Sequence, residues 1–156
     1  MKKILTLCII LQNNKILLGM KKRGFGAGKW NGFGGKLHEG ETIEEGLKRE
    51  SFEEAGINLR EIEKVGIIDF AFIGDPKILE VHIFKCTGFE GEPMETEEMK
   101  PQWFSDKSIP YETMWPDDKF WLPILLEGKK FQGKFTFDNL DSTKIINHSL
   151  GVVDKL

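Results

Sequence analysis

An arginine and three glutamates lie within six positions of one another: Arg49, Glu50, Glu53 and Glu54. At about 100° per residue of an α-helix, Glu50 and Glu54 share one side, and Glu53 lies about 80–100° from them. Like charges three and four residues apart repel, so the spacing predicts a cation close by. Oxygen ligands suit Mg²⁺, with Mn²⁺ as a substitute. We therefore predict that these glutamates bind a divalent metal ion.

A helix over residues 42–55 would carry these side chains. Thr42 and Glu45 match a capping box at its start, and Gly56 supplies a left-handed stop at its end. The alternative is an ordinary acidic helix with its charges in solvent, and we take Phe52 on the outer side as an argument against it. The inward side begins apolar and ends in carboxylates, with Ile43, Leu47, Glu50 and Glu54 in order.

These residues belong to a longer pattern over residues 35–57, G-x5-E-x7-R-E-U-x-E-E-x-G-U, in which U is bulky and apolar. Ser51 is the exception, because it stands at a U position. On this motif the chain resembles the Nudix hydrolases. The resemblance implies an α/β fold, with a mixed β-sheet sandwiched between α-helices in a single domain over residues 1–156. The positions in register are Gly35, Glu41, Arg49, Glu50, Glu53, Glu54, Gly56 and Ile57.

Composition restricts the class of protein. A chain of 156 residues has the size of one domain, and 40% hydrophobic with 30% charged residues is usual for soluble globular proteins. A net charge of −3 provides no basic field for a nucleic-acid polymer. Cys8 and Cys86 lie in apolar runs, which favours buried free thiols in a reducing compartment. We expect a monomer in the cytoplasm, with the nucleus and the mitochondrial matrix as alternatives.

Apolar runs and alternation predict the other elements. The first run is too short to span a bilayer and leads into a turn, so we interpret it as a strand and expect no targeting segment and no membrane partner. A second helix is expected at residues 117–127, where Pro123 should kink or shorten it. Helices on both faces of a mixed sheet give an α/β sandwich. The predicted strands are residues 4–11, 15–20, 64–73, 78–87, 101–105 and 130–137.

A glycine-rich segment at residues 21–36 precedes the motif and holds six glycines. Such a segment lets the backbone approach a ligand and expose its N–H groups. Beside a metal-binding helix it is a candidate wall for a phosphate site. Lys21, Lys22 and Arg23 are the nearest cations, although they could equally be plain surface charges.

Two segments outside the motif narrow the resemblance. GMKKRGFGAGKWNGFGGK at residues 19–36 and MWPDD at residues 114–118 are similar to segments of one Nudix subgroup, the vertebrate hydrolases of oxidised purine nucleoside triphosphates. The similarity runs from about Thr6 to Val153. It implies Mg²⁺-dependent hydrolysis of substrates such as 8-oxo-dGTP and 2-hydroxy-dATP, and possible action on methylated purines. The products would be the monophosphate and pyrophosphate, and the nucleotide pool would be cleansed.

The same resemblance assigns a base pocket. Asn31, Asp117 and Asp118 would read the base edges, and Trp115 would stack on the ring. Burial and mutual repulsion raise a carboxyl pKa, so one aspartate of the pair could stay protonated and the two could read different purine edges. From the residues alone, Pro116 followed by two acids is equally a common helix start. Further implied contacts are Thr6, Lys21, Phe25, Gly35, Lys36, Phe70, Phe72 and Leu79 in the pocket, and Gly34 and Glu98 at the metal.

The sequence leaves several roles open. We favour Glu53 as general base, and Arg49 as the residue that orients the carboxylates. Phe70 and Phe72, taken as bare sequence, suit a hydrophobic core. Leu79 stands where the subgroup has methionine, which leaves the ranking of substrates open. The alternatives are a Nudix hydrolase of another nucleotide, such as ADP-ribose or a dinucleoside polyphosphate, and a non-catalytic nucleotide-binding module.

Overall fold

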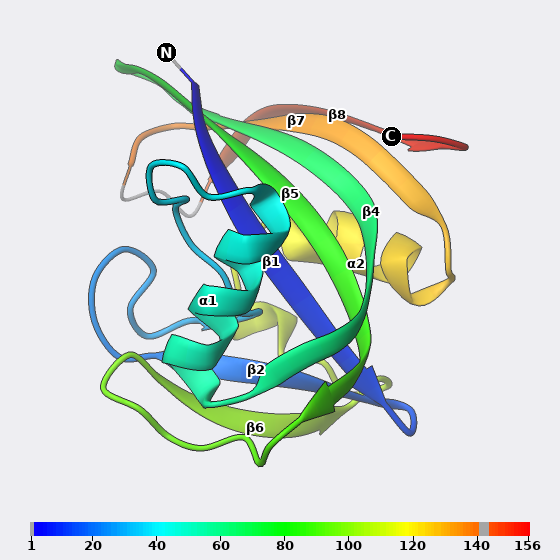
Figure 1. The fold of residues 1–156 in the computed structure, drawn as a ribbon. Coiled ribbons are helices and arrows are strands. Elements are labelled where there is room, and N and C mark those ends of the chain that lie inside the picture. The colour runs from blue at the N-terminus through cyan, green and yellow to red at the C-terminus, as the bar shows by residue number, and fades with distance from the viewer. Residues whose placement is uncertain (1, 141–143) are drawn as a thin grey trace.

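A mixed β-sheet runs through the molecule, with helix α1 (Ile43–Ala55) over one face and helix α2 (Asp118–Leu126) over the other, as Figure 1 shows. The computed structural model describes residues 2–140 and 144–156. The strands are β1 (Lys2–Gln12), β2 (Lys15–Lys21), β3 (Trp30–Asn31), β4 (Asn58–Phe72), β5 (Asp75–Glu90), β6 (Met99–Ser105), β7 (Lys130–Phe137) and β8 (Ile145–Val153). A short 3-10 helix spans Tyr111–Thr113.

The sheet combines parallel and antiparallel pairs. Its strand order is β3-β2-β1-β5-β4-β7-β8, with β6 paired to β2. Strand β5 is parallel to β1 and antiparallel to β4, and β4 is parallel to β7. The sheet is therefore mixed and covered on both faces, as the sequence predicted.

Strands β1 and β2 separate soon after the turn that joins them. Their paired register covers only Ile10 to Gln12 on β1, after which β2 pairs with β6 along its length. The glycine-rich segment lies against the free part of β1, with bridges from Phe33 to Cys8 and from Lys36 to Leu5. A Cβ atom on Gly34 would lie 1.9 Å from the Thr6 carbonyl oxygen, so this approach requires glycine.

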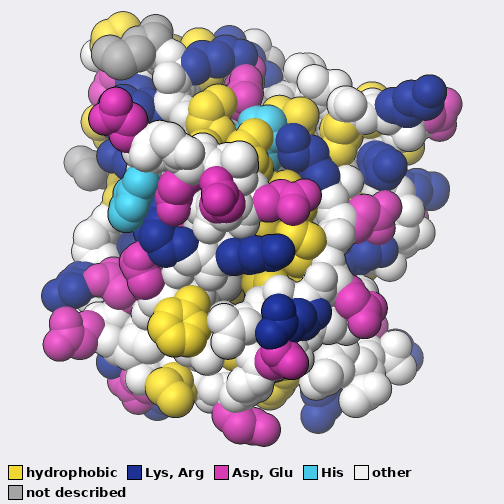
Figure 2. Space-filling view, viewed as in Figure 1, with side chains coloured by type: hydrophobic (Ala, Val, Ile, Leu, Met, Phe, Trp, Pro, Cys, Tyr) yellow, Lys and Arg dark blue, Asp and Glu magenta, His cyan; other side chains and the backbone are white. Residues whose placement is uncertain are grey.

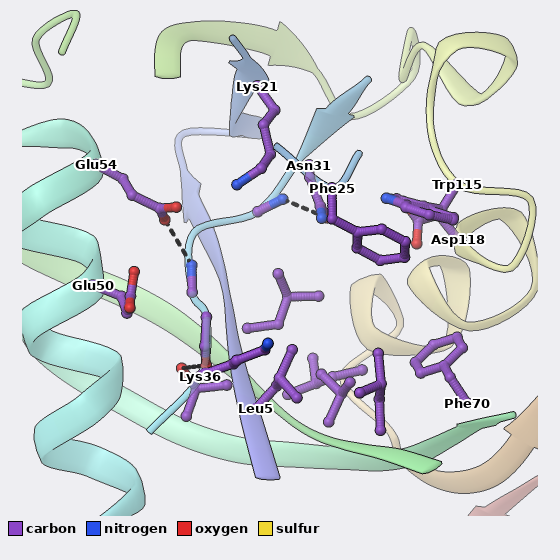
Figure 3. Close-up of a pocket in the computed structure, with 18 of the residues that line it drawn as sticks. Leu5, Lys21, Phe25, Asn31, Lys36, Glu50, Glu54, Phe70, Trp115 and Asp118 are labelled. Atoms are coloured by element: carbon purple, nitrogen blue, oxygen red, sulfur yellow. Dashed lines mark hydrogen bonds between the residues drawn. The ribbon is translucent and has the colours of Figure 1, made fainter. Parts of the chain in front are cut away.

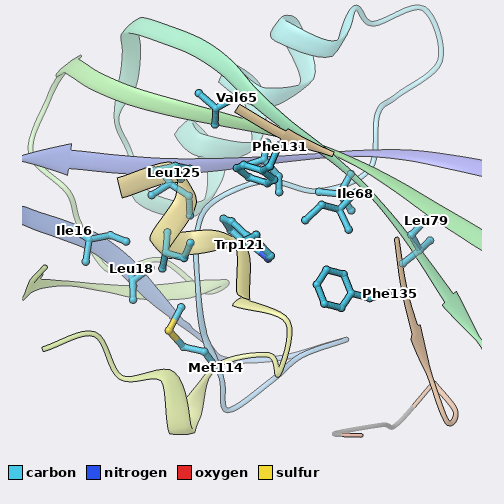
Figure 4. Packing of buried hydrophobic residues seen from close by; sticks show 14 of the residues in the cluster. Ile16, Leu18, Val65, Ile68, Leu79, Met114, Trp121, Leu125, Phe131 and Phe135 are labelled. Atoms are coloured by element: carbon cyan, nitrogen blue, oxygen red, sulfur yellow. The ribbon is translucent and has the colours of Figure 1, made fainter. Parts of the chain in front are cut away.

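Each face of the sheet has its own apolar core. The core on the α2 side includes Trp121, Phe131 and Phe135, whose packing Figure 4 shows. The core on the α1 side includes Leu47 and Phe33, together with both cysteines. Cys8 and Cys86 are buried free thiols, which confirms the prediction made for them.

All six predicted strands are present, and β4 and β5 extend beyond their predicted bounds. Two strands were missed. β3 has only two residues, and β8 lies at an edge of the sheet where Ile146 and Val152 are exposed, so its alternation does not follow burial. Helix α2 is one residue shorter at each end than predicted, with Pro123 inside it. None of the described helices is long and apolar enough to cross a membrane.

Helix α1 begins at Ile43, with Thr42 as its N-cap, and both bonds of the predicted capping box are present. Gly56 ends the helix at φ 71°. The argument from Phe52 was wrong: its side chain is 55% exposed and lies on the solvent side. The outer face of α1 is an ordinary solvated face there, and the unusual feature is the burial of acids on the inner face.

Candidate active site

One cavity of about 520 Å³ lies between α1, the free part of β1 and the segment that leads into α2. Figure 3 shows Glu50 and Glu54 reaching it from α1, with Phe25, Trp115 and Asp118 on the opposite side. Every residue predicted for substrate or metal lines this cavity. The predicted residues are Thr6, Lys21, Phe25, Asn31, Gly34, Gly35, Lys36, Glu50, Glu53, Glu54, Phe70, Phe72, Leu79, Glu98, Trp115, Asp117 and Asp118.

Arg49 lies behind the cavity and holds the acids of α1. Its Nη1 atom donates to Glu50 at 3.0 Å and to Glu53 at 2.9 Å, and its Nε atom donates to Glu41 at 2.6 Å. A fourth bond, from Nη2 to the Lys36 carbonyl oxygen at 3.1 Å, ties the helix to the glycine-rich segment. The bond from Arg49 lowers the pKa of the Glu41 carboxyl to about 2. This geometry fits an orienting role for Arg49.

Glu54 is the most enclosed of these acids, with 4% of its surface exposed. The backbone N–H of Gly34 donates to it at 2.8 Å, the bond drawn in Figure 3. Burial raises the pKa of the Glu54 carboxyl to about 8, and burial also raises the pKa of Glu50. A Cβ atom on Gly35 would lie 2.8 Å from the Glu50 carboxyl carbon, so glycine lets the segment pass close to the acids.

The carboxylates at this end are each bonded to a protein donor. Arg49 holds Glu50 and Glu53, the Gly34 amide holds Glu54, and Arg23 holds Glu98 at 2.5 Å. Within residues 2–140 and 144–156, no three acidic, histidine or cysteine side chains lie close enough together to coordinate one metal ion. Binding a metal here therefore requires carboxylates to turn away from these donors.

The donor set nevertheless fits a hard divalent cation. It consists of carboxylate oxygens, the ligands that Mg²⁺ and Mn²⁺ prefer. Glu54 supports the fit independently, because a carboxyl buried this deeply keeps its proton unless a cation compensates the charge.

The opposite end of the cavity is aromatic. The Trp115 ring lies 5.0 Å from the Phe25 ring and 6.0 Å from the Phe137 ring, centroid to centroid. Lys29 Nζ lies 5.4 Å from the centre of the Trp115 ring. Phe25 is 54% exposed at the mouth, whereas Phe72 is nearly buried and belongs to both the core and the cavity wall. This end offers flat apolar surfaces of the size of a purine.

Asp117 and Asp118 lie at this aromatic end, each 3% exposed. Trp121 Nε1 donates to Asp117 at 2.8 Å, and Oδ2 of Asp118 has no hydrogen-bond partner in the described part of the chain. Burial raises the pKa of Asp117 to about 6 and that of Asp118 well above its usual value. Asp117 occupies the N-cap position of α2 but makes no capping bond with its side chain. The two aspartates thus stand at the start of the helix, but the Asp117 side chain does not cap it.

Comparisons with known proteins identify the family. The NUDIX domain model matches residues 1–125. The chain belongs to the Nudix family. It is 53% identical to the mouse oxidized purine nucleoside triphosphate hydrolase, over 97% of this chain and 96% of that protein. It is 50% identical to the zebrafish protein of the same name, over 99% and 97%.

A solved Nudix structure agrees with the fold. The crystal structure of the MutT protein from Bacillus halodurans matches with a TM-score of 0.84 at 28% identity, covering 95% of this chain and 97% of that one. The α/β architecture, with a mixed sheet between helices, is thus that of the Nudix fold.

Sequence reasoning missed part of the cavity wall of this Nudix domain. Trp121 had a readable signal, because it follows Asp117 by four residues on one helix. The others are apolar strand positions, and the sequence does not say which face of the sheet carries a cavity. The missed lining residues are Leu5, Leu7, Gly32, Val81, Ile83, Met99, Trp121 and Phe137.

Proposed function

We propose that this Nudix protein hydrolyses oxidised purine nucleoside triphosphates, such as 8-oxo-dGTP and 2-hydroxy-dATP, to the monophosphate and pyrophosphate. The names of the mouse and zebrafish relatives, at 53% and 50% identity over nearly whole chains, support this substrate class. Such an activity removes damaged nucleotides before a polymerase can insert them. The observation that carries the proposal is the buried Asp117–Asp118 pair beside the aromatic wall of a cavity whose other end holds the Nudix acids.

The aspartate pair suits purines whose edges have been altered by oxidation. A protonated carboxyl donates a hydrogen bond and an ionised one accepts, so a pair that shares a proton can present either arrangement. The raised pKa values of Asp117 and Asp118 keep a proton available near neutral pH. Trp115 supplies a stacking surface, and Asn31 adds an amide at the base edge. Its Oδ1 atom already accepts from the Gly32 N–H at 2.9 Å, which fixes its orientation.

The phosphates belong at the α1 end of the cavity. Glu50, Glu53, Glu54 and Glu98, with the Gly34 carbonyl, would hold Mg²⁺. A bound Mg²⁺ neutralises phosphate charge and activates a water. We assign the general base to Glu53, because its side chain is 48% exposed while that of Glu50 is 18% exposed. Arg49 positions both acids through the bonds described above.

Lysines complete the phosphate end. Lys21 and Lys36 are the cationic side chains among the described residues that line the cavity. Figure 3 shows both projecting into the space between the α1 acids and the aromatic wall. Together with exposed amides of the glycine-rich segment they provide donors for phosphate oxygens. Elsewhere on the face seen in Figure 2, acidic and basic side chains are interspersed, which gives a nucleic-acid polymer no continuous basic track.

A substrate panel tests the proposal. We would measure kcat/KM with Mg²⁺ for 8-oxo-dGTP, 2-hydroxy-dATP, a methylated purine triphosphate, dGTP, dATP and ADP-ribose, and identify the products. The proposal expects pyrophosphate and a clear preference for the oxidised triphosphates. Preference for ADP-ribose would instead make the chain a Nudix hydrolase of another nucleotide. Nucleotide binding without hydrolysis would make it a binding module.

A further inference from the structure

Acidic side chains outnumber basic ones along the cavity wall. Six aspartate and glutamate side chains line it, against the two lysines Lys21 and Lys36. A triphosphate adds several more negative charges at the α1 end. A divalent cation offsets only part of this excess, so a further cation near that end would improve binding.

Arg23 stands beside that end without lining the cavity. Its guanidinium donates to one oxygen of Glu98 from Nε at 3.1 Å and from Nη2 at 2.5 Å. A second acid, Glu97, lies 3.7 Å from Nη2. The Arg23 side chain is 60% exposed, and an ion pair with such exposure is cheap to separate. Arg23 is thus paired with Glu98, whose carboxylate is itself a proposed metal ligand.

The contact between Arg23 and Glu98 is not what holds the two loops together. The neighbouring Lys22 does this through its backbone N–H, which donates to the Glu98 carbonyl oxygen at 2.9 Å. Its Nζ atom also donates to the Thr96 carbonyl oxygen at 2.8 Å and pairs with Glu95. The guanidinium can therefore leave Glu98 while the backbone of both loops stays in place.

The loop that carries Arg23 touches both ends of the cavity. Two residues after Arg23, Phe25 packs on Trp115 at the base end, and the loop is closed by the bond from the Gly28 N–H to the Lys21 carbonyl oxygen at 2.9 Å. Arg23 is on the side of this loop that faces Glu98. A released guanidinium would consequently lie nearer the phosphates than the base.

We propose that Glu98 holds Arg23 in the nucleotide-free protein and releases it to the terminal phosphates when Glu98 turns to the metal ion. The inference rests on the proposed function, since it requires metal and phosphates at the α1 end. Arg23 would then distinguish ligands by their number of phosphate groups. It would contribute to binding of the triphosphate and not of the monophosphate product. It would also weaken metal binding in the absence of nucleotide, because it competes for Glu98.

The first test measures Mn²⁺ binding without nucleotide, by calorimetry or by paramagnetic resonance, in wild type and Arg23→Gln. We expect the variant to bind Mn²⁺ about two- to fivefold more tightly, the range that an exposed ion pair is worth. Arg60→Gln is the matched control: Arg60 pairs with Glu90, is similarly exposed, and neither residue lines the cavity. Equal or weaker Mn²⁺ binding in Arg23→Gln than in Arg60→Gln overturns the competition between Arg23 and the metal.

The second test compares two ligands in the presence of Mg²⁺: a non-hydrolysable analogue of 8-oxo-dGTP and the product 8-oxo-dGMP. We expect Arg23→Gln to weaken the triphosphate analogue about tenfold or more, as loss of a charged hydrogen bond does, and to leave 8-oxo-dGMP unchanged. An equal change for both ligands overturns the proposal. The Mn²⁺ test uses no nucleotide, so it stands even if wild type prefers a different substrate in the panel above.

Discussion

The two ends of the cavity differ in the donors that face their acidic side chains. At the α1 end the acids meet N–H donors, among them the guanidinium groups of Arg49 and Arg23. At the α2 end Asp117 and Asp118 are buried, and the Trp121 indole donates to Asp117. At the first end Glu50, Glu53 and Glu98 face guanidinium groups, whereas the more deeply buried Glu54 has a raised pKa, as both aspartates do at the second end.

This difference supports the proposed placement of the phosphates at the α1 end and of the base at the α2 end. Carboxylates that already face guanidinium groups can exchange them for a metal ion. The metal ion and the released guanidinium groups can then bind phosphate groups. A buried pair that shares one proton keeps a single negative charge and presents both a hydrogen-bond donor and an acceptor, which suits the polar edge of a base. Substitutions at either end test this comparison, and those of Glu53, Trp115 and the two aspartates are each expected to act at one end only.

The largest effect is expected at the α1 end from Glu53→Gln. The change is nearly isosteric, so the fold should persist while kcat falls about 10²-fold or more, since general-base catalysis contributes 10²–10⁴. Steady-state kinetics at saturating Mg²⁺ measures the loss. Glu44→Gln, at an exposed acid on the first turn of the same helix, is the control and should leave kcat unchanged. Activity of Glu53→Gln within a few-fold of wild type would remove Glu53 from the mechanism.

At the base end, Trp115→Ala should weaken nucleotide binding by about 1–3 kcal/mol, the value of stacking one base on an aromatic ring. KM for 8-oxo-dGTP should rise accordingly, and Mn²⁺ affinity should not change, because Trp115 lies at the far end from the acids of α1. If KM stayed constant while the melting temperature fell sharply, Trp115 would be a core residue and the stacking role would be wrong.

The aspartate pair gives a test of substrate preference. Asp117→Asn and Asp118→Asn should each change the ratio of kcat/KM for 8-oxo-dGTP over 2-hydroxy-dATP by about tenfold, because an amide cannot exchange donor and acceptor roles. The ratio cancels any uniform loss from altered packing. An unchanged ratio in both variants would contradict proton sharing as the basis of recognition.

The same pair has a pH signature of opposite sign to that of Glu41, the acid that pairs with Arg49 just before α1. The folded-state pKa of Asp117 is raised to about 6, so the folded protein binds more protons than the unfolded chain and loses stability as pH rises from about 4 to about 6. The pKa of Asp118 is raised in the same direction, so Asp118→Asn should stabilise more at pH 8 than at pH 4 in urea titrations. Glu41→Gln should instead destabilise the protein, because the pKa of Glu41 is lowered to about 2. The stability that Glu41 contributes is present above pH 4.5 and is lost as pH falls towards 2.

The α1 end could be predicted from the sequence because its determinants are local. The capping box at Thr42, the stop at Gly56 and the spacing of the acids all lie within one helix, so the helical period alone places them. Even there the sequence could not say that each acid faces a protein donor. The bond between Arg23 and Glu98 joins loops 75 residues apart, and no local pattern encodes it.

The base end could be assigned only through resemblance. Asn31, Phe70 and Asp117 come from three distant segments that the sheet brings together, and nothing in their local spacing points to one cavity. The helix-start interpretation of the two aspartates was reasonable from sequence. It is correct in position, because α2 begins at Asp118 with Asp117 at the N-cap. It could not show that Trp121 donates to the Asp117 side chain, which makes no capping bond.

The smallest expected effect comes from Ser51, which departs from the Nudix motif and belongs to neither end. Its side chain is fully buried, and its hydroxyl has no hydrogen-bond partner among the described residues. A buried hydroxyl without a partner loses its hydration and gains nothing, whereas alanine buries no polar atom and favours the helix. Ser51→Ala should therefore raise the free energy of unfolding by about 1 kcal/mol and leave kcat/KM unchanged. Chemical denaturation and the substrate panel check both halves of this prediction. A destabilised Ser51→Ala would show that the hydroxyl is satisfied in solution, and a changed kcat/KM would show that Ser51 positions its neighbour Glu50.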